Sequence, residues 1–108
     1  MERAEKTCGE IEMRALSPRE VTELHGRVPG WSLVDRAIER EFRFKDFREA
    51  MAFVNKVATL SEAEGHHPDI SISYSKVLLT LSTHKVSALS CRDFVLAEKI
   101  DGLAGSER

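Results

Sequence analysis

Two stretches in which apolar and polar residues alternate are the feature of this sequence that most constrains its fold. Residues 31–44 and 70–81 both follow a period of two, which predicts β-strands with one apolar face. Each stretch has a short link, near residues 35–36 in the first and 75–76 in the second, so each reads as a hairpin. Arg40 interrupts the apolar row of the first hairpin. It should therefore lie near a sheet edge or extend its charge to water.

The segment between the two hairpins has the spacing of a long helix. Asp46 can cap its first turn, Glu49 stands at the capping-box position, and the helix should end near Gly65 because Pro68 disfavours helix just before it. The expected inward stripe, with spacings of three and four, is Phe47, Ala50, Met51, Val54, Val57, Ala58 and Ser61.

Two further helices are predicted at the two ends of the chain. Ser17-Pro18-Arg19-Glu20 has the residues of a capping box with proline at the first helical position, and Pro29-Gly30 should end that helix. Ser90-Cys91-Arg92-Asp93 resembles a second capping box. It should open a helix whose inward residues are Phe94, Ala97, Ile100 and Leu103.

These elements give the order α-β-β-α-β-β-α and an α+β fold. Two hairpins separated by a helix favour an antiparallel four-stranded sheet, and one apolar face per strand places all three helices on one side of it. The other side carries serines 71, 73 and 75 and should face water or a second subunit. Residues 1–108 are expected to form one domain, with 1–15 and 105–108 as loose ends.

Composition excludes several classes of protein. The net charge of −2, with scattered positive residues, argues against direct nucleic-acid binding. No apolar run approaches the roughly 20 residues of a membrane span, and the charged N-terminus does not resemble a signal peptide, which favours the cytoplasm. Cys8 and Cys91 match no zinc or redox spacing, so two free thiols are expected.

Three of the four histidines should gather at one end of the sheet. His66 and His67 lie in the link between the long helix and the third strand, and His84 lies just past the fourth strand. A hairpin that turns at Ser75-Lys76 would place His67 opposite His84. Imidazole exchanges protons near neutral pH, because its ordinary pKa is about 6.5. The cluster is therefore a candidate acid–base site.

Carboxylates close to this cluster could fix the histidine tautomers. Glu62 lies one helical turn before the histidine pair, and Arg92-Asp93 begins the last helix nearby. Two other interpretations remain open, a polar loop cluster without function and a zinc site built from three histidines. Adjacent histidines are awkward ligands for one ion and no cysteine joins them, so no metal site is predicted.

The same residues resemble the signature of the pterin-4a-carbinolamine dehydratases. The resemblance runs through Glu62, His66-His67-Pro68, Tyr74, His84 and Asp93, and continues in PGW at 29–31, EFRFKDFREAMAFVNKVA at 41–58 and the ending RDFVLAEKID. It covers residues 16–103. It implies the α+β fold described above and the dehydration of a 4a-hydroxytetrahydropterin, in tetrahydrobiopterin recycling, without metal or redox cofactor.

The resemblance also implies roles for individual residues. His66, His67 and His84 would be catalytic and would contact the pterin. Pro68 and Thr83 would contact it through backbone groups. Glu62, Arg92 and Asp93 would support the histidines. Trp31 matches a tryptophan near the family's pocket, with plain core packing as the equal alternative.

Two positions depart from the family's common pattern, and the family also offers a second function. Many members have an aromatic residue where this chain has Ile70, and some have an acidic residue where it has Gly65. His25 lies outside the motif and should be a surface residue. Some relatives are transcriptional coactivators or non-catalytic assembly proteins, but such members tend to lose histidines that this chain keeps. A dehydratase that forms a homodimer or homotetramer is therefore the leading prediction.

Overall fold

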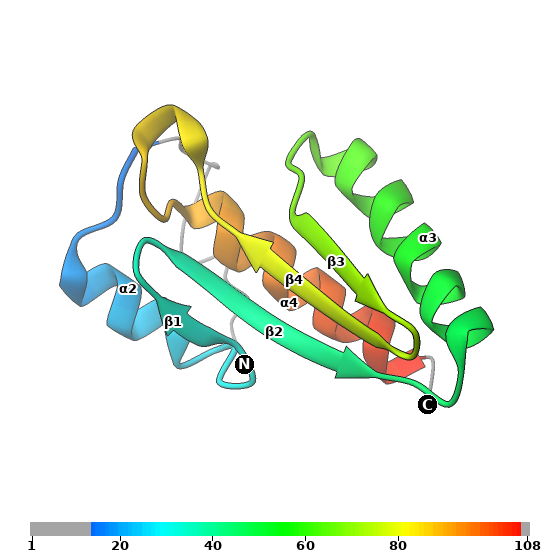
Figure 1. Cartoon of the computed structure of the whole chain (residues 1–108). Coiled ribbons are helices and arrows are strands. Elements are labelled where there is room, and N and C mark those ends of the chain that lie inside the picture. Colours follow the sequence, from blue (N-terminus) through cyan, green and yellow to red (C-terminus); the bar gives the residue numbers. More distant parts are fainter. Residues whose placement is uncertain (1–13, 107–108) are drawn as a thin grey trace.

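The four-stranded antiparallel sheet and the three helices predicted from the sequence are present, in the predicted order. The structure, a computed structural model, describes residues 14–106 (Figure 1). The elements are α2 (Pro18–His25), β1 (Ser32–Val34), β2 (Ala37–Arg43), α3 (Phe47–Glu64), β3 (Asp69–Ser73), β4 (Lys76–Leu81), the 3₁₀ turn η1 (His84–Val86) and α4 (Cys91–Ser106).

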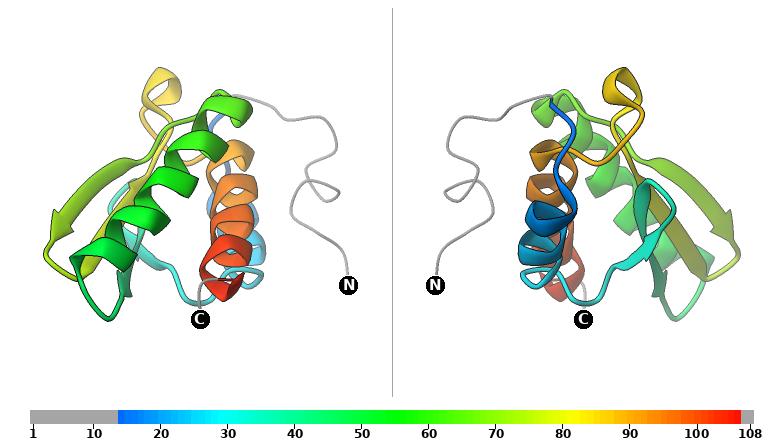
Figure 2. Two further views of the ribbon diagram at one scale, coloured as in Figure 1. Left: turned by 90° about the vertical axis from the view of Figure 1, so that its right-hand side faces the viewer. Right: turned by 90° about the vertical axis from the view of Figure 1, so that its left-hand side faces the viewer.

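The two hairpins lie side by side with their second strands in contact. The strand order is β1-β2-β4-β3, and β2 pairs with β4 from Ile38↔Leu81 to Arg43↔Lys76. All three helices lie on one side of the sheet (Figure 2). The fully buried β4 residues Val77, Leu79 and Leu81 face these helices, as the alternation predicts. The fold class is therefore α+β, as expected.

The second hairpin turns one residue earlier than predicted. Ser73 pairs with Lys76 rather than with Leu78, so Tyr74 and Ser75 form the turn. Tyr74 is not a strand residue. It has a left-handed φ of 51°, a conformation that tyrosine rarely adopts and that strand propensity does not anticipate. Continuing the register beyond Asp69↔Thr80 places His67 level with Ser82, not with His84 as predicted.

The first helix begins as predicted and ends sooner. Ser17 and Glu20 form the reciprocal capping box, with Pro18 at the first helical position. The helix ends at His25, before the expected stop at Pro29-Gly30. Val28, predicted to lie on the helix, is buried in the turn that follows.

The long helix has the predicted ends but a rotated inner face. Asp46 accepts a hydrogen bond from the Glu49 amide, and Gly65 adopts the left-handed conformation that ends the helix. Phe47, predicted inward, is 50% exposed, and Ala58 is also exposed. Phe53 is fully buried in their place. It packs between two β2-side rings, Phe42 at 4.8 Å and Phe44 at 5.0 Å between centroids.

Arg40 does not lie at a sheet edge, because β2 is a central strand. Its side chain is partly buried, with 26% exposed. Its guanidinium lies over the ring of Phe42 and forms an ion pair with Asp101 of α4, with 3.0 Å between Nη1 and Oδ1. The same carboxylate oxygen accepts a hydrogen bond from the indole of Trp31 at 2.8 Å. An interior charge is thus satisfied on the helix-covered side.

The C-terminal helix is longer than predicted, and one cysteine differs from its prediction. Most of the segment 1–15 lies outside the described residues, and α4 continues to Ser106. Cys91, the first residue of α4, is disulfide-bonded, so the expectation of two free thiols is wrong. Within residues 14–106, no helix is long and apolar enough to span a membrane.

Candidate functional site

The candidate site lies at the end of the sheet where α3 ends, β4 ends and α4 begins. The 65–68 link and the turn η1 both emerge at this end, on either side of the end of β4, with the start of α4 beside them (Figure 1). The pairing of β3 with β4 sets this arrangement, because Asp69 pairs with Thr80 and the residues just before β3 and just after β4 therefore lie at the same end of the sheet. Residues far apart in the sequence therefore meet there.

His66 and Asp93 form the buried centre of the site. The Nε2 atom of His66 lies 2.6 Å from Oδ1 of Asp93. Only 9% of His66 is exposed, and Asp93 is fully buried. A carboxylate can only accept, so Nε2 of His66 is the donor in this contact, and in the neutral ring Nδ1 keeps the lone pair. Of the two carboxylates expected to support the histidines, Asp93 is the one in contact with His66.

The second oxygen of Asp93 binds two donors from separate segments. Oδ2 accepts from the Thr83 hydroxyl at 2.8 Å and from the Ser90 amide at 2.9 Å. The two hydroxyls also contact each other, with 2.7 Å between Thr83 Oγ1 and Ser90 Oγ. Thr83 thus reaches the site through its side chain, whereas the family resemblance implies that its backbone contacts the substrate. Ser90 was predicted only as a helix cap.

Contacts between α3 and α4 hold the histidine link in place. The Arg92 guanidinium donates to the carbonyl of Glu64 at 3.2 Å, the last residue of α3. Lys99 forms an ion pair with the Glu64 carboxylate at 2.9 Å. The left-handed Gly65 then redirects the chain, and the His66 amide bonds the Ser61 carbonyl. Arg92 therefore supports the link through the backbone at the end of α3.

His67 lies outside the buried centre and has a carboxylate of its own. Its Nε2 atom lies 2.5 Å from Oε2 of Glu62. Both side chains are largely exposed, 59% for His67 and 78% for Glu62. The two predicted carboxylate–histidine pairs thus form separately, one buried and one open to solvent.

The remaining predicted site residues lie at different depths. His84 is exposed at the start of η1, and within the described residues no hydrogen bond joins its ring to His66 or His67. Pro68 is partly buried just before β3. Trp31 is 1% exposed and bonds Asp101, more than two helical turns along α4 from Asp93. Its surroundings favour the core-packing interpretation. His25 is partly buried, and its Nε2 contacts the Trp31 carbonyl at 2.5 Å.

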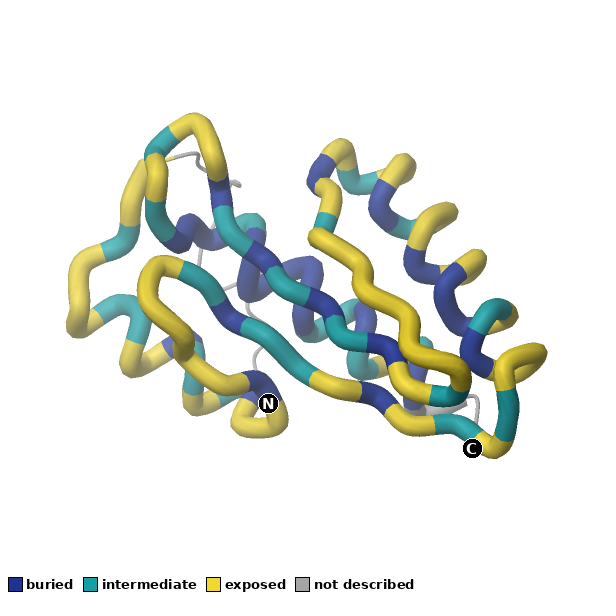
Figure 3. The backbone as a smooth tube through the Cα atoms, in the orientation of Figure 1, coloured by how far each residue is buried: buried dark blue, intermediate teal, exposed yellow. Residues whose placement is uncertain are grey.

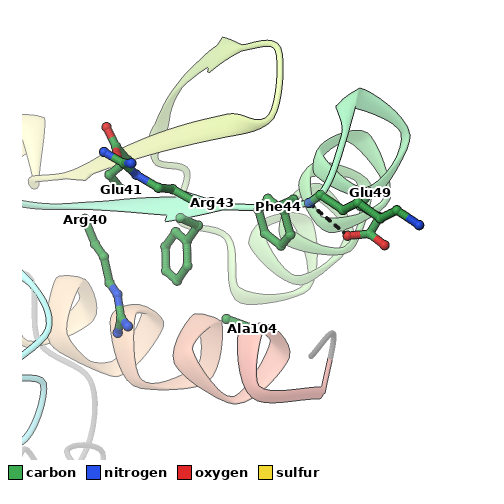
Figure 4. A pocket seen from close by; sticks show the side chains of 8 residues that line it. Arg40, Glu41, Arg43, Phe44, Glu49 and Ala104 are labelled. Atoms are coloured by element: carbon green, nitrogen blue, oxygen red, sulfur yellow. Dashed lines mark hydrogen bonds and ion pairs between the residues drawn. The ribbon is translucent and has the colours of Figure 1, made fainter.

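A cavity of about 400 Å³ lies elsewhere in the molecule (Figure 4). It is lined by the last residues of β2, Phe44, Glu49 of α3 and Ala104 of α4. Two of its polar side chains already have partners in the chain, since Arg40 pairs with Asp101 and Glu49 accepts from the Lys45 amide. The site of proton-exchanging groups is therefore distinct from this hollow.

The acidic and histidine side chains of residues 14–106 are arranged in pairs rather than as a metal site. Between residues 14 and 106, no group of three or more histidine, cysteine, aspartate or glutamate side chains is placed to hold one metal ion. What the arrangement can do is move protons, because two imidazoles each have a carboxylate on one ring nitrogen.

Comparisons with known proteins identify relatives of this chain. A protein of Nitrosospira multiformis named "Putative pterin-4-alpha-carbinolamine dehydratase" is 43% identical over 102 residues, covering 93% of this chain and 90% of that protein. One of the same name from Acidobacterium capsulatum is 48% identical over 91 residues, covering 84% and 99%.

Two solved structures share the fold. One is described as a transcriptional coactivator/pterin dehydratase from Brucella melitensis, with a TM-score of 0.81, 35% identity, and coverage of 85% of this chain and 100% of that one. The other is described as a pterin dehydratase-like RuBisCO assembly factor of the alpha-carboxysome, with a TM-score of 0.59, 28% identity, and coverage of 69% and 87%. Residues 14–103 match the family described as "Pterin 4 alpha carbinolamine dehydratase". The chain therefore belongs to the pterin-4a-carbinolamine dehydratase family.

Proposed function

We propose that this protein dehydrates a 4a-hydroxytetrahydropterin to the quinonoid dihydropterin and water. The C4a–O bond breaks and the hydroxyl leaves as water after receiving a proton from an acid. The proton on N5 passes to a base, and the electron pair it leaves behind forms the N5=C4a double bond. The reaction is redox-neutral, so two proton-transfer groups are sufficient.

The observation that carries this proposal is the buried pairing of His66 with Asp93. The carboxylate holds the Nε2 proton, which leaves Nδ1 of His66 to accept or return a proton. His67, with Glu62 on its own ring nitrogen, is the adjacent imidazole and is open to solvent. We propose that these two histidines and His84, one residue beyond Thr83, divide the acid and base roles at the pterin. Pro68 and the backbone of Thr83 would border the substrate.

The test is a turnover assay with a 4a-hydroxytetrahydropterin. We expect His66→Ala and His84→Ala to lower kcat by about 10²–10⁴-fold, the usual contribution of a positioned acid or base. Lys85→Ala, an exposed change beside His84, is the matched control and should keep full activity. Full activity in both histidine variants would exclude the site. Loss of activity on adding a chelator would instead favour the zinc interpretation.

A non-catalytic assembly role is the rival proposal, because one relative of this fold is described as a RuBisCO assembly factor. The two carboxylate–histidine pairs favour the enzyme, since binding another protein does not require a buried imidazole with a fixed tautomer. A wild-type protein that folds but shows no turnover with the pterin would support the rival.

We also propose that copies of the chain associate through the edge strand β3. Every residue of β3 is exposed, and Ile70 and Ile72 are each 38% exposed (Figure 3). Natural proteins usually protect such an edge by pairing it or by placing charge on it. Light scattering should give a dimer or tetramer, and the double variant Ile70→Lys, Ile72→Lys should give a monomer. A monomeric wild type at micromolar concentration would contradict this.

We further propose that the protein acts in the cytoplasm, in tetrahydrobiopterin recycling. The disulfide at Cys91 is unusual for a reducing compartment. Cell fractionation with thiol labelling tests both points together, and recovery of the protein outside the cytoplasm would overturn the location.

A further inference from the structure

We infer that the side-chain hydroxyls of Thr83 and Ser90 are positioning groups that fix the Asp93 carboxylate against His66. This inference rests on the proposed function, because it concerns how the same site is kept ready for proton transfer. Neither hydroxyl contacts His66 itself. They act through Asp93, whose Oδ2 atom accepts from Thr83 while its Oδ1 atom accepts from His66.

The number of available protons determines which group donates in each hydrogen bond of this series. A carboxylate has no proton to give, so the one hydroxyl proton of Thr83 points to Asp93. The 2.7 Å contact between Thr83 and Ser90 then requires the Ser90 hydroxyl to be the donor. The oxygen of Ser90 in turn accepts from the Arg92 amide at 3.3 Å. Every donor in this series therefore points toward Asp93.

Burial strengthens this series of hydrogen bonds. Thr83 is 1% exposed, and Ser90 and Asp93 are fully buried. No buried side-chain polar atom within the described residues lacks a hydrogen-bond partner. In a dry interior hydrogen bonds are stronger, successive bonds polarise one another, and an unpaired group is costly. The hydroxyls can therefore hold the carboxylate in one rotamer, with one oxygen reserved for the His66 ring.

The segments that supply these groups explain why the arrangement is stable. Thr83 is fixed by backbone hydrogen bonds with Ala88 in both directions, at 3.0 and 3.4 Å. Ser90 is fixed by the first turn of α4, where the Asp93 amide bonds its carbonyl at 3.1 Å. The loop 83–90 thus closes on itself and presents both hydroxyls to one carboxylate.

Two substitutions at position 83 separate the hydroxyl from the packing. Thr83→Val keeps the shape of the side chain and removes the hydroxyl, whereas Thr83→Ser keeps the hydroxyl and removes the methyl group. We expect Thr83→Val to lower kcat about tenfold to a hundredfold with KM nearly unchanged, the loss that follows from one hydrogen bond to a charged group. Thr83→Ser should retain activity within about threefold. The reverse order would overturn the inference.

A nuclear magnetic resonance measurement keeps the inference separate from the proposed function. In the wild type the Nε2 proton of His66 should give a downfield signal that exchanges slowly with water. Thr83→Val and Ser90→Ala should shift this signal and speed its exchange, while Thr83→Ser should leave it in place. If the wild type shows no dehydratase activity, this signal still decides the role of the two hydroxyls.

The matched control is Ser61→Ala, which removes another buried hydroxyl at the end of α3. Ser61 bonds only the carbonyl of Val57 with its side chain, at 2.7 Å. The control should leave both the His66 signal and kcat unchanged. An unchanged His66 signal in both Thr83→Val and Ser90→Ala, with each variant folded, would overturn the inference. Should Thr83→Val fail to fold, Ser90→Ala carries the test alone.

Discussion

The Nε2 atom of His66 lies 2.6 Å from Oδ1 of Asp93, and this contact joins residues that are 27 positions apart in the chain. One residue follows the long helix and the other belongs to the first turn of α4. Because the carboxylate can only accept, the contact defines which nitrogen of His66 is free for chemistry.

Replacing Asp93 by asparagine should leave His66 in place but with the wrong ring nitrogen protonated. The asparagine amide can donate to Nε2, which would move the proton to Nδ1. We expect kcat to fall by about 10²–10⁴-fold, with a much smaller change in KM. Steady-state kinetics and circular dichroism check this together. Unchanged kcat in a folded variant would show that the tautomer of His66 is irrelevant.

Replacing Glu62 by glutamine tests the second pair, which is exposed. Surface ion pairs contribute little to folding, so the free energy of unfolding should change by less than about 1 kcal/mol. If His67 transfers a proton, kcat should nevertheless fall and its pH dependence should change. Urea titration and a pH–rate profile provide the two measurements. Loss of stability without any change in the profile would assign the pair a structural role.

Protonation of Asp101 should be visible in the fluorescence of Trp31, the only tryptophan of the chain. Burial raises the pKa of Asp101 above its ordinary value of 3.8, although its bonds to Trp31 and Arg40 oppose the rise. At a pH between the ordinary pKa of Asp101, which applies to the unfolded chain, and its raised pKa in the folded chain, the folded chain binds more protons than the unfolded chain. The contribution of Asp101 to stability therefore grows as the pH falls through the folded-state pKa and is lost as the pH rises.

The variant Asp101→Asn provides the comparison for this titration. We expect an acid fluorescence transition with a midpoint above 3.8 in the wild type and none in the variant. Relative to the variant, the wild type should become more stable as the pH falls through that midpoint. A difference of the opposite sign, measured by urea unfolding at several pH values, would contradict the raised pKa.

A side chain at position 30 should displace the Arg40 guanidinium, which occupies the adjacent space. A Cβ atom at position 30 would lie 2.5 Å from Nη1 of Arg40. Gly30→Ala should therefore displace Arg40 from Phe42 and Asp101 and cost about 1 kcal/mol. In an Arg40→Ala background the same change should cost little. Equal costs in both backgrounds, measured by thermal or urea unfolding, would show that the two residues are not coupled.

The sequence predicted the elements of the fold well because caps and hydrophobic periods are local signals. The starts of α2 and α3 and the inward row of β4 are as expected. The predicted register of the second hairpin was wrong because Tyr74 takes a left-handed turn conformation against its strand propensity. Tertiary packing also decided that Phe53 rather than Phe47 is buried, since both are apolar but lie about 120° apart around the helix axis.

The candidate site was predictable in part for a similar reason. The family signature and hairpin topology indicate where His66, His67 and Asp93 gather. The role of Ser90 was not predictable, because a serine at a helix start is adequately explained as a cap. Only the packed structure brings its hydroxyl to Thr83.

The site is assembled from three segments that are separate in the sequence and meet only in the folded chain. His66 follows one helix, Thr83 follows the last strand, and Asp93 belongs to the final helix. No peptide shorter than residues 66–93 contains all three groups. During a denaturant titration the catalytic rate should therefore fall together with global cooperative unfolding. Turnover would then measure the fraction of native protein without a spectroscopic probe.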